Sequence, residues 1–193
     1  MADTFNENKV RFGLRNVHYA LGTPDGNGGY TYGTPVKFPG AVSLSLDPDG
    51  EEEVFYADDI KYYICGGSNG YTGTLEMARI IDSFRKDVLG ETLDGSGVLL
   101  ENANAEAKVF ALLFEFEGDQ RARRHVLYGC TAGRPSLSGQ TTEGGSKTPQ
   151  TESVSISAAP DKDGKVKAST TATTSSTVYD AWYQSVYGMT AAA

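Results

Sequence analysis

AKVFALLFEFE, which occupies residues 107–117, is the stretch that decides the fold. Alternate side chains of a strand point to opposite faces, so both faces of this stretch would be apolar for most of its length. Such a strand belongs in the middle of a sheet covered on both sides, or at a face that another subunit covers. One face would carry Phe110, Leu112, Phe114 and Phe116, and the other Val109, Ala111, Leu113 and Glu115.

The neighbouring segments predict a mainly β fold with antiparallel strands. Gly118 begins a turn into a second apolar run, so the two runs are expected to form a long hairpin. Alternating apolar and polar residues between turn-forming residues predict the other strands. We expect strands at 10–21, 41–46, 51–56, 60–64, 71–79, 123–131, 153–158 and 165–174, with turns at 47–50 and 161–164; the second turn would join the last two strands as a hairpin. This order predicts an antiparallel β-sandwich or partly closed barrel.

Two helices are expected beside the sheet. The first follows Asp82, a candidate N-cap, and ends near Gly90, where a left-handed residue is favoured. The second covers 178–187, with Ser175 or Ser176 as its cap. Their buried residues are predicted to include Phe84, Val88, Leu89 and Trp182.

Long loops are expected at about 22–33 and 137–147, within a single domain spanning 1–193. The first is too rich in glycine for a helix and too long for a tight hairpin. We expect both loops to be mobile in the isolated chain and to become ordered against a neighbour.

The amino-acid composition limits the classes of function that the protein can have. Seventeen Lys and Arg against 25 Asp and Glu give a net charge of −8, and this disfavours tight binding to nucleic acid. No apolar run could span a membrane, and no secretory signal is apparent. Cys65 and Cys130 are predicted to be reduced cytosolic thiols, with a disulfide between them as the alternative.

Motifs for catalysis, metals or cofactors are not found in the sequence. His18 and His125 lack a neighbouring nucleophile motif and are interpreted as surface or edge residues. The acidic run from Asp47 to Asp59 lacks the spacing of an EF-hand loop, so we interpret it as a solvated hairpin tip. We therefore predict no catalytic residue, no metal and no cofactor.

Several segments, in order, resemble the major tail proteins, or tail tube proteins, of long-tailed phages with non-contractile tails. The opening NKVRFGLRNVHYA from Asn8 fits the start of that family. The further segments are VKFPGAVSLSL from Val36, FYADDI from Phe55, YTGTLEMA from Tyr71 and FRKDVLGE from Phe84.

The resemblance implies a structural virion protein without catalytic residues. Six copies would form a ring, and stacked rings would form a tube through which genomic DNA passes without tight binding. Some members of the family carry an additional immunoglobulin-like domain, for which this chain leaves no room. The implied partners are identical copies, a tape-measure protein and a tail terminator, with assembly in the host cytoplasm and final location in the virion tail.

Two sets of residues are candidates for roles in such a tube. Acidic side chains facing the lumen would repel DNA phosphates, and Asp47, Asp49, Glu51 and Glu52 are the hypothesised lumen acids. The hypothesised inter-subunit residues are Phe110, Leu112, Phe114, Phe116, Gly22, Gly26, Gly29 and Tyr30.

Two alternatives remain open. A soluble β-sandwich that binds carbohydrate would use some of the eleven tyrosines. A hydrolase would need a pair of carboxylates at a fixed separation, drawn from Asp58, Asp59 and Glu76.

Overall fold

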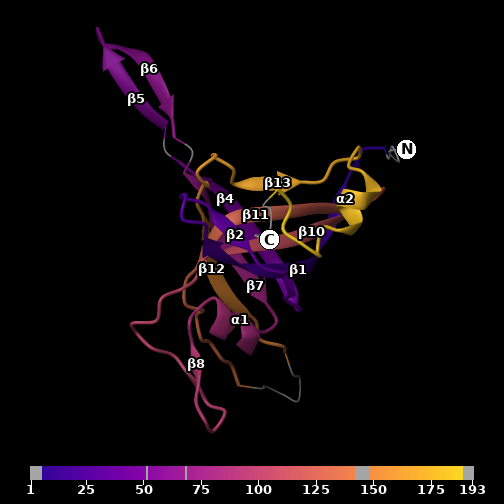
Figure 1. Cartoon of the computed structure of the whole chain (residues 1–193). Helices are drawn as coiled ribbons and strands as arrows, with labels where there is room; N and C mark the ends of the chain where they lie inside the picture. Colours follow the sequence, from indigo (N-terminus) through magenta and orange to yellow (C-terminus); the bar gives the residue numbers. More distant parts are fainter. Residues whose placement is uncertain (1–5, 51, 68, 142–147, 189–193) are drawn as a thin grey trace.

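A computed structural model describes residues 6–50, 52–67, 69–141 and 148–188. The chain is mainly β, with antiparallel sheets and short helices, as predicted (Figure 1). The strands before the first helix are β1 (Arg11–Pro24), β2 (Tyr30–Tyr32), β3 (Val36–Lys37), β4 (Ala41–Asp49), β5 (Glu52–Ala57), β6 (Ile60–Gly66) and β7 (Gly70–Met77). The later elements are α1 (Asp82–Asp87), β8 (Thr92–Leu93), β9 (Leu99–Leu100), β10 (Phe110–Gly118), β11 (Arg123–Ala132), β12 (Glu152–Ala158), β13 (Lys167–Ser169) and α2 (Ser176–Asp180).

One nine-stranded sheet forms the body. Its main order is β2-β1-β10-β11-β12-β7-β4, with β13 paired to β11 and β3 paired to β1. The sheet curves so that β1 contacts β4, but the described residues of these two strands form no ladder. The body is therefore sandwich-like and is not closed into a barrel. Two further pairs, β5-β6 and β8-β9, form separate two-stranded sheets.

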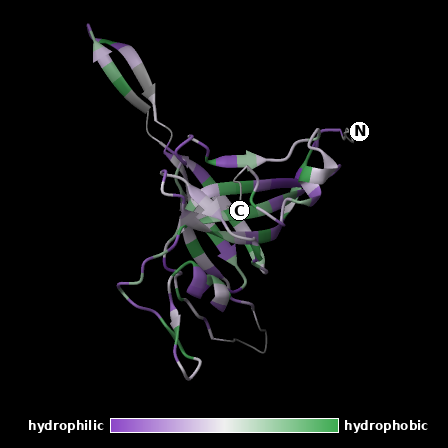
Figure 2. Cartoon of the chain, in the orientation of Figure 1, coloured by the Kyte–Doolittle hydropathy of each residue, from purple (hydrophilic) through white to green (hydrophobic). Residues whose placement is uncertain are grey.

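Both faces of β10 are covered by the chain itself. Phe110, Leu112 and Phe114 lie in one core cluster, together with Phe84 of α1. Ala111 and Leu113 lie in the other cluster, beside Trp182 of the C-terminal segment. The green apolar residues accordingly concentrate in the centre of the body (Figure 2). Of the two settings expected for this strand, the structure has the sheet that is covered on both sides.

Half of the predicted loop at 22–33 is strand, because 22–24 belong to β1 and 30–32 form β2. Gly22 pairs with Tyr32 and Pro24 pairs with Tyr30, so β1 and β2 form a hairpin. Its connection is held by Asp25, whose carboxylate accepts hydrogen bonds from the backbone N–H groups of Asn27 and Gly29 at 2.8 and 2.9 Å. The connection is therefore an Asx-type turn, and the expected mobility of this segment in the isolated chain stays a prediction. Of the other predicted loop, 137–141 contain no strand or helix, and 142–147 lie outside the described residues.

Several local predictions also need correction. Residues 47–49 continue β4 instead of forming a turn, because they pair with the start of β7. Strand β13 pairs with β11 and not with β12, so 161–164 does not close a hairpin. Asp82 is the first residue of α1, and its carboxylate accepts from Arg79 instead of capping the helix. The cap of α2 is Ser175, as predicted, although the helix ends at Asp180.

Candidate functional site

A β-hairpin stands away from the body and is the most unusual feature of the surface (Figure 1). Strands β5 and β6 pair only with each other, and we call residues 52–66 the arm. Asp58 and Asp59 form its turn, with φ values of 52° and 60°. Positive φ at both central residues is typical of the tight hairpin turn whose twist matches that of the strands. The predicted acidic hairpin tip is therefore confirmed for Asp58 and Asp59, whereas Asp47 and Asp49 of the same acidic run lie in β4 and not at the tip.

The arm exposes large apolar side chains to solvent, and green segments are visible along it in Figure 2. Consecutive residues of a strand point to opposite faces, so the adjacent pairs Phe55-Tyr56 and Tyr62-Tyr63 place aromatic rings on both faces. Phe55 lies directly opposite Tyr63 across the two strands, so these two rings share one face. The exposed fractions are 61% for Phe55, 59% for Tyr56, 60% for Ile60, 68% for Tyr62 and 62% for Tyr63.

Three of the four hypothesised lumen acids, Asp47, Asp49 and Glu52, lie in the strands on either side of the point where the arm leaves the body. Asp47 and Asp49 are exposed at the end of β4. Glu51 lies outside the described residues, while Glu52 is the first residue of β5. These positions and the acidic tip give this end of the molecule a negative character.

A basic hollow lies at the opposite end of the sheet. The strand register shows this separation. At the end of the sheet near the arm, neighbouring strands place four residues side by side: Phe110, Cys130, Ala158 and Tyr71. At the opposite end of the sheet, Phe116 pairs with Arg123. The hollow has a volume of about 250 Å³. Its lining residues, which define the basic hollow below, are Asn8, Lys9, Val10, Arg11, Phe116, Arg123 and His125.

His125 contributes a neutral ring to the basic hollow. It stacks on Phe114, with ring centroids 5.2 Å apart, and it contacts the edge of Phe116. Burial, with smaller effects from nearby cations such as Arg123, lowers the pKa of His125 to about 4. The positive charge of the hollow at neutral pH therefore comes from its Lys and Arg residues.

His18 likewise stacks on an aromatic ring, that of Tyr183 at 4.5 Å. Both histidines are partly buried packing residues, more enclosed than the predicted surface or edge positions.

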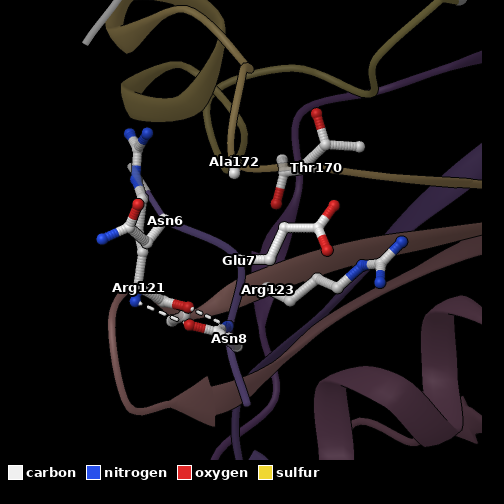
Figure 3. Close-up of a pocket in the computed structure, with 9 residues that line it drawn as sticks. Asn6, Glu7, Asn8, Arg121, Arg123, Thr170 and Ala172 are labelled. Atoms are coloured by element: carbon white, nitrogen blue, oxygen red, sulfur yellow. Dashed lines mark hydrogen bonds between the residues drawn. The ribbon is translucent and has the colours of Figure 1, made fainter. Parts of the chain in front are cut away.

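A second, smaller hollow of about 190 Å³ lies beside the first, and Figure 3 shows its lining. Asn8 fixes the N-terminal segment there, because its side-chain amide donates to the carbonyl oxygen of Arg121 at 2.6 Å. The Asn8 side-chain oxygen accepts from the backbone N–H groups of Gln120 and Arg121 at 3.0 and 3.1 Å. These bonds hold the strand entering β1 against the β10–β11 turn. No local pattern indicates this contact, since Asn8 and Arg121 are far apart along the chain.

The hypothesised inter-subunit residues on β10 need correction. Phe110 and Leu112 are fully buried and Phe114 is 2% exposed, so these three side chains offer no surface to another subunit. Phe116 is the exception, because it is partly buried and lines the basic hollow. Gly22, Gly26, Gly29 and Tyr30 lie in or beside the β1–β2 hairpin, and their role between subunits stays a prediction.

Of the acids proposed for a hydrolase, Glu76 is not brought together with Asp58 and Asp59. Asp58 and Asp59 lie at the tip of the arm, whereas Glu76 lies near the far end of β7. Glu76 accepts hydrogen bonds from Thr151 and Ser43 at 2.6 and 2.8 Å, which lower its pKa. Within the described part of the chain, no group of three His, Cys, Asp or Glu residues could hold a metal ion. No helix in that part is long and apolar enough to cross a membrane.

Cys130 is a free thiol inside the core, so it forms no disulfide with Cys65. Burial raises the pKa of Cys130 to about 12, which keeps the thiol protonated and unreactive.

No family model and no curated protein matches the chain. Among solved structures, it is similar to a chain from the cryo-EM structure of the anti-feeding prophage cap, the cap that terminates the tube. The TM-score is 0.46 at 9% identity, over 86% of this chain and 96% of that chain. A chain from the six-fold symmetrised baseplate of the anti-feeding prophage gives a TM-score of 0.43 at 8% identity, over 82% of this chain and 94% of that chain. These low scores assign no function to the chain described here.

Proposed function

We propose that this protein is a structural subunit of a phage tail. Identical copies would associate into hexameric rings, and stacked rings would form a tail tube that conducts DNA during ejection. The arm is the observation that carries the proposal. A two-stranded hairpin is marginally stable alone, and exposed apolar side chains on both of its faces mark a protein contact.

Unpaired strand edges support association between identical copies. Strand β4 is the last in the sheet order, so the described chain pairs it on one side only. Residues 11–15 of β1 pair with β10, while β2 and β3 pair with later residues of β1. Long unpaired edges promote aggregation unless a partner covers them. A neighbouring subunit on each edge would remove both edges in a closed ring.

Charge supports passage of DNA without tight binding. Each subunit carries a net charge of −8, and Asp47 and Asp49 are exposed near the base of the arm. A ring that turned such residues toward its lumen would repel phosphates, whereas a basic lining would bind them. A tape-measure protein inside the tube and a tail terminator at its end complete the proposed set of partners, and the virion tail is the proposed location.

The proposal is tested by negative-stain electron microscopy of the purified protein over a concentration series, alone and with a tape-measure protein. We expect hollow rings or tubes with six subunits per ring above a threshold concentration. A monomer at every concentration, in both settings, would contradict the proposal.

A further inference from the structure

We propose that the basic hollow receives the tip of the arm from a second copy of this chain. This inference rests on the proposed function, because it names the surface on which the arm of a neighbouring subunit docks. In this contact, the tip of the arm of one copy meets the basic hollow of another copy, so the two surfaces differ although the molecules are identical.

The charge of the basic hollow is opposite to that of the two carboxylates at the tip of the arm, Asp58 and Asp59, although the arm also carries the exposed Lys61. Lys9, Arg11 and Arg123 are all exposed, and the lining contributed by the described residues contains no carboxylate. Among the residues that the structure describes, none of these three cations forms an ion pair. The tip of the arm presents Asp58 and Asp59, both exposed. Opposite charges placed this way steer association and fix the register of a contact.

The nearest carboxylates leave these cations available. Glu117 is paired with Arg15 at 3.1 Å. Asp119 accepts from the backbone N–H of Lys9 at 2.9 Å, a bond that does not use the ammonium group. Glu7 and Arg123 both line the adjoining smaller hollow, but they form no ion pair among the described residues (Figure 3). The guanidinium of Arg123 donates to the hydroxyl of Ser169 at 3.1 Å and has further N–H groups to offer.

Apolar groups complement one another as well. Val10 is 50% exposed at the rim, Phe12 nearby is 58% exposed, and Phe116 forms part of the wall. The guanidinium of Arg11 lies over the Phe116 ring, 5.1 Å from its centre, so a charged group and an aromatic ring lie side by side in the wall of the hollow. Tyr56 and Ile60 flank the acidic tip of the arm, so they would bury their apolar surface there when the tip enters.

The geometry requires two different molecules. The arm leaves one end of the sheet and the basic hollow lies at the other, so the arm of a chain does not reach its own hollow. A contact that joins two different surfaces is heterologous and leaves one free arm and one free hollow on every pair. Further copies then add in the same direction, which is what a ring or a stack of rings requires.

Cysteine cross-linking tests the contact directly. In a Cys65→Ser background, one chain carries Ile60→Cys at the tip of the arm and the other carries Val10→Cys at the rim of the hollow. On mild oxidation we expect a covalent dimer only in the mixture of the two chains. One chain that carries both cysteines should give a ladder of covalent oligomers. Leu137→Cys, at a position 91% exposed outside the hollow, is the control for random collisions and should give no specific dimer with Ile60→Cys.

Charge reversal gives an independent readout. Arg11→Glu with Arg123→Glu should raise the threshold concentration for assembly by at least about tenfold, because the acidic tip would meet like charge. Lys86→Glu with Lys108→Glu makes the same charge change at exposed positions outside the hollow and should leave the threshold unchanged. Thermal unfolding of each variant is the control that tests whether its monomer remains folded.

The outcomes separate this inference from the proposed function. If the wild-type protein forms tubes but the mixture gives no cross-link and Arg11→Glu with Arg123→Glu leaves the threshold unchanged, the docking surface is overturned while the tail role stands. If the reversed variant assembles normally but loses affinity for a short DNA duplex, the hollow binds phosphates and the inference is also overturned. If the wild-type protein forms no assembly at all, the proposed function itself fails.

Discussion

The guanidinium of Arg124 lies 3.0 Å from the carboxylate of Glu115 inside the body of the protein, and both side chains are largely shielded from solvent. Asn16 donates to the same carboxylate at 2.6 Å, and the hydroxyl of Tyr183 donates to it at 3.0 Å. Arg124 also donates to the carbonyl oxygen of Tyr179 and lies over the ring of that residue. This network joins β1, β10 and β11 to the C-terminal segment.

Glu115→Leu should therefore destabilise the fold strongly. The substitution leaves the Arg124 charge buried without its counterion, and breaking a buried pair in this way costs about 3–5 kcal/mol. Denaturant unfolding followed by circular dichroism measures the change in the free energy of unfolding. Glu117→Leu, which removes the exposed partner of Arg15, should cost less than about 1 kcal/mol. Equal effects of the two substitutions would contradict this role of Glu115.

The low pKa of His125 predicts a loss of stability in acid. Because the pKa is about 4 in the folded chain and about 6.5 when unfolded, the unfolded state binds more protons between these values. The contribution of His125 to stability is therefore complete above pH 6.5 and decreases as the pH falls toward 4. A titration of the imidazole by NMR gives the pKa directly. Denaturant unfolding at pH 7 and pH 5 should show a smaller loss for His125→Gln than for the wild type; an imidazole that titrates near 6.5 would refute the prediction.

Gly73 should not tolerate a side chain, although Gly13 should. A Cβ atom at Gly73 would lie 1.9 Å from the carbonyl oxygen of Ser45, where β7 pairs with β4. The strands would have to move apart, so Gly73→Ala should cost about 1–3 kcal/mol. A Cβ atom at Gly13 would meet nothing within 4 Å, so Gly13→Ala should leave the midpoint of thermal unfolding nearly unchanged. Similar midpoints for both variants would contradict the close packing of β4 on β7.

The exposed rings of the arm should matter for assembly and not for folding. Tyr62→Ser with Tyr63→Ser removes side chains that are 68% and 62% exposed, so the midpoint of thermal unfolding should change little. Analytical ultracentrifugation should show loss of large assemblies. Tyr187→Ser, at a ring that is 48% exposed on the C-terminal segment, is the matched control and should assemble as the wild type does. Normal assembly by the arm variant would argue that the arm makes no contact between copies.

The sequence predicted the strands well, because alternation of apolar residues depends on local geometry alone. A sheet covered on both sides was one of the two settings that it offered for 107–117, and it interpreted the run that includes Asp58 and Asp59 as a hairpin tip; the structure has the covered sheet and places these two acids at a tip. The pairing of β13 with β11 was missed, because an adjacent turn at 161–164 favoured a local hairpin. The long-range partner of a strand is set by packing, which local patterns do not encode.

The candidate surfaces were harder to predict for the same reason. Apolar alternation marked β10 as a subunit contact, but the chain covers both of its faces with α1 and the C-terminal segment. The exposed rings of Phe55 and Tyr63 have the same alternation as a half-buried strand, and only the structure shows that nothing covers them. The basic hollow joins Lys9 and Arg11 to Arg123 across the β1–β10–β11 ladder, a proximity that no spacing along the chain reveals.

A cryo-EM reconstruction of the assembled particle is the most direct test of the central claim that the arm binds a second copy. We expect Tyr62 and Tyr63 of every subunit to be buried against an identical neighbour within a hollow tube. Particles in which the arm projects freely into solvent, with contacts between copies made elsewhere, would contradict it.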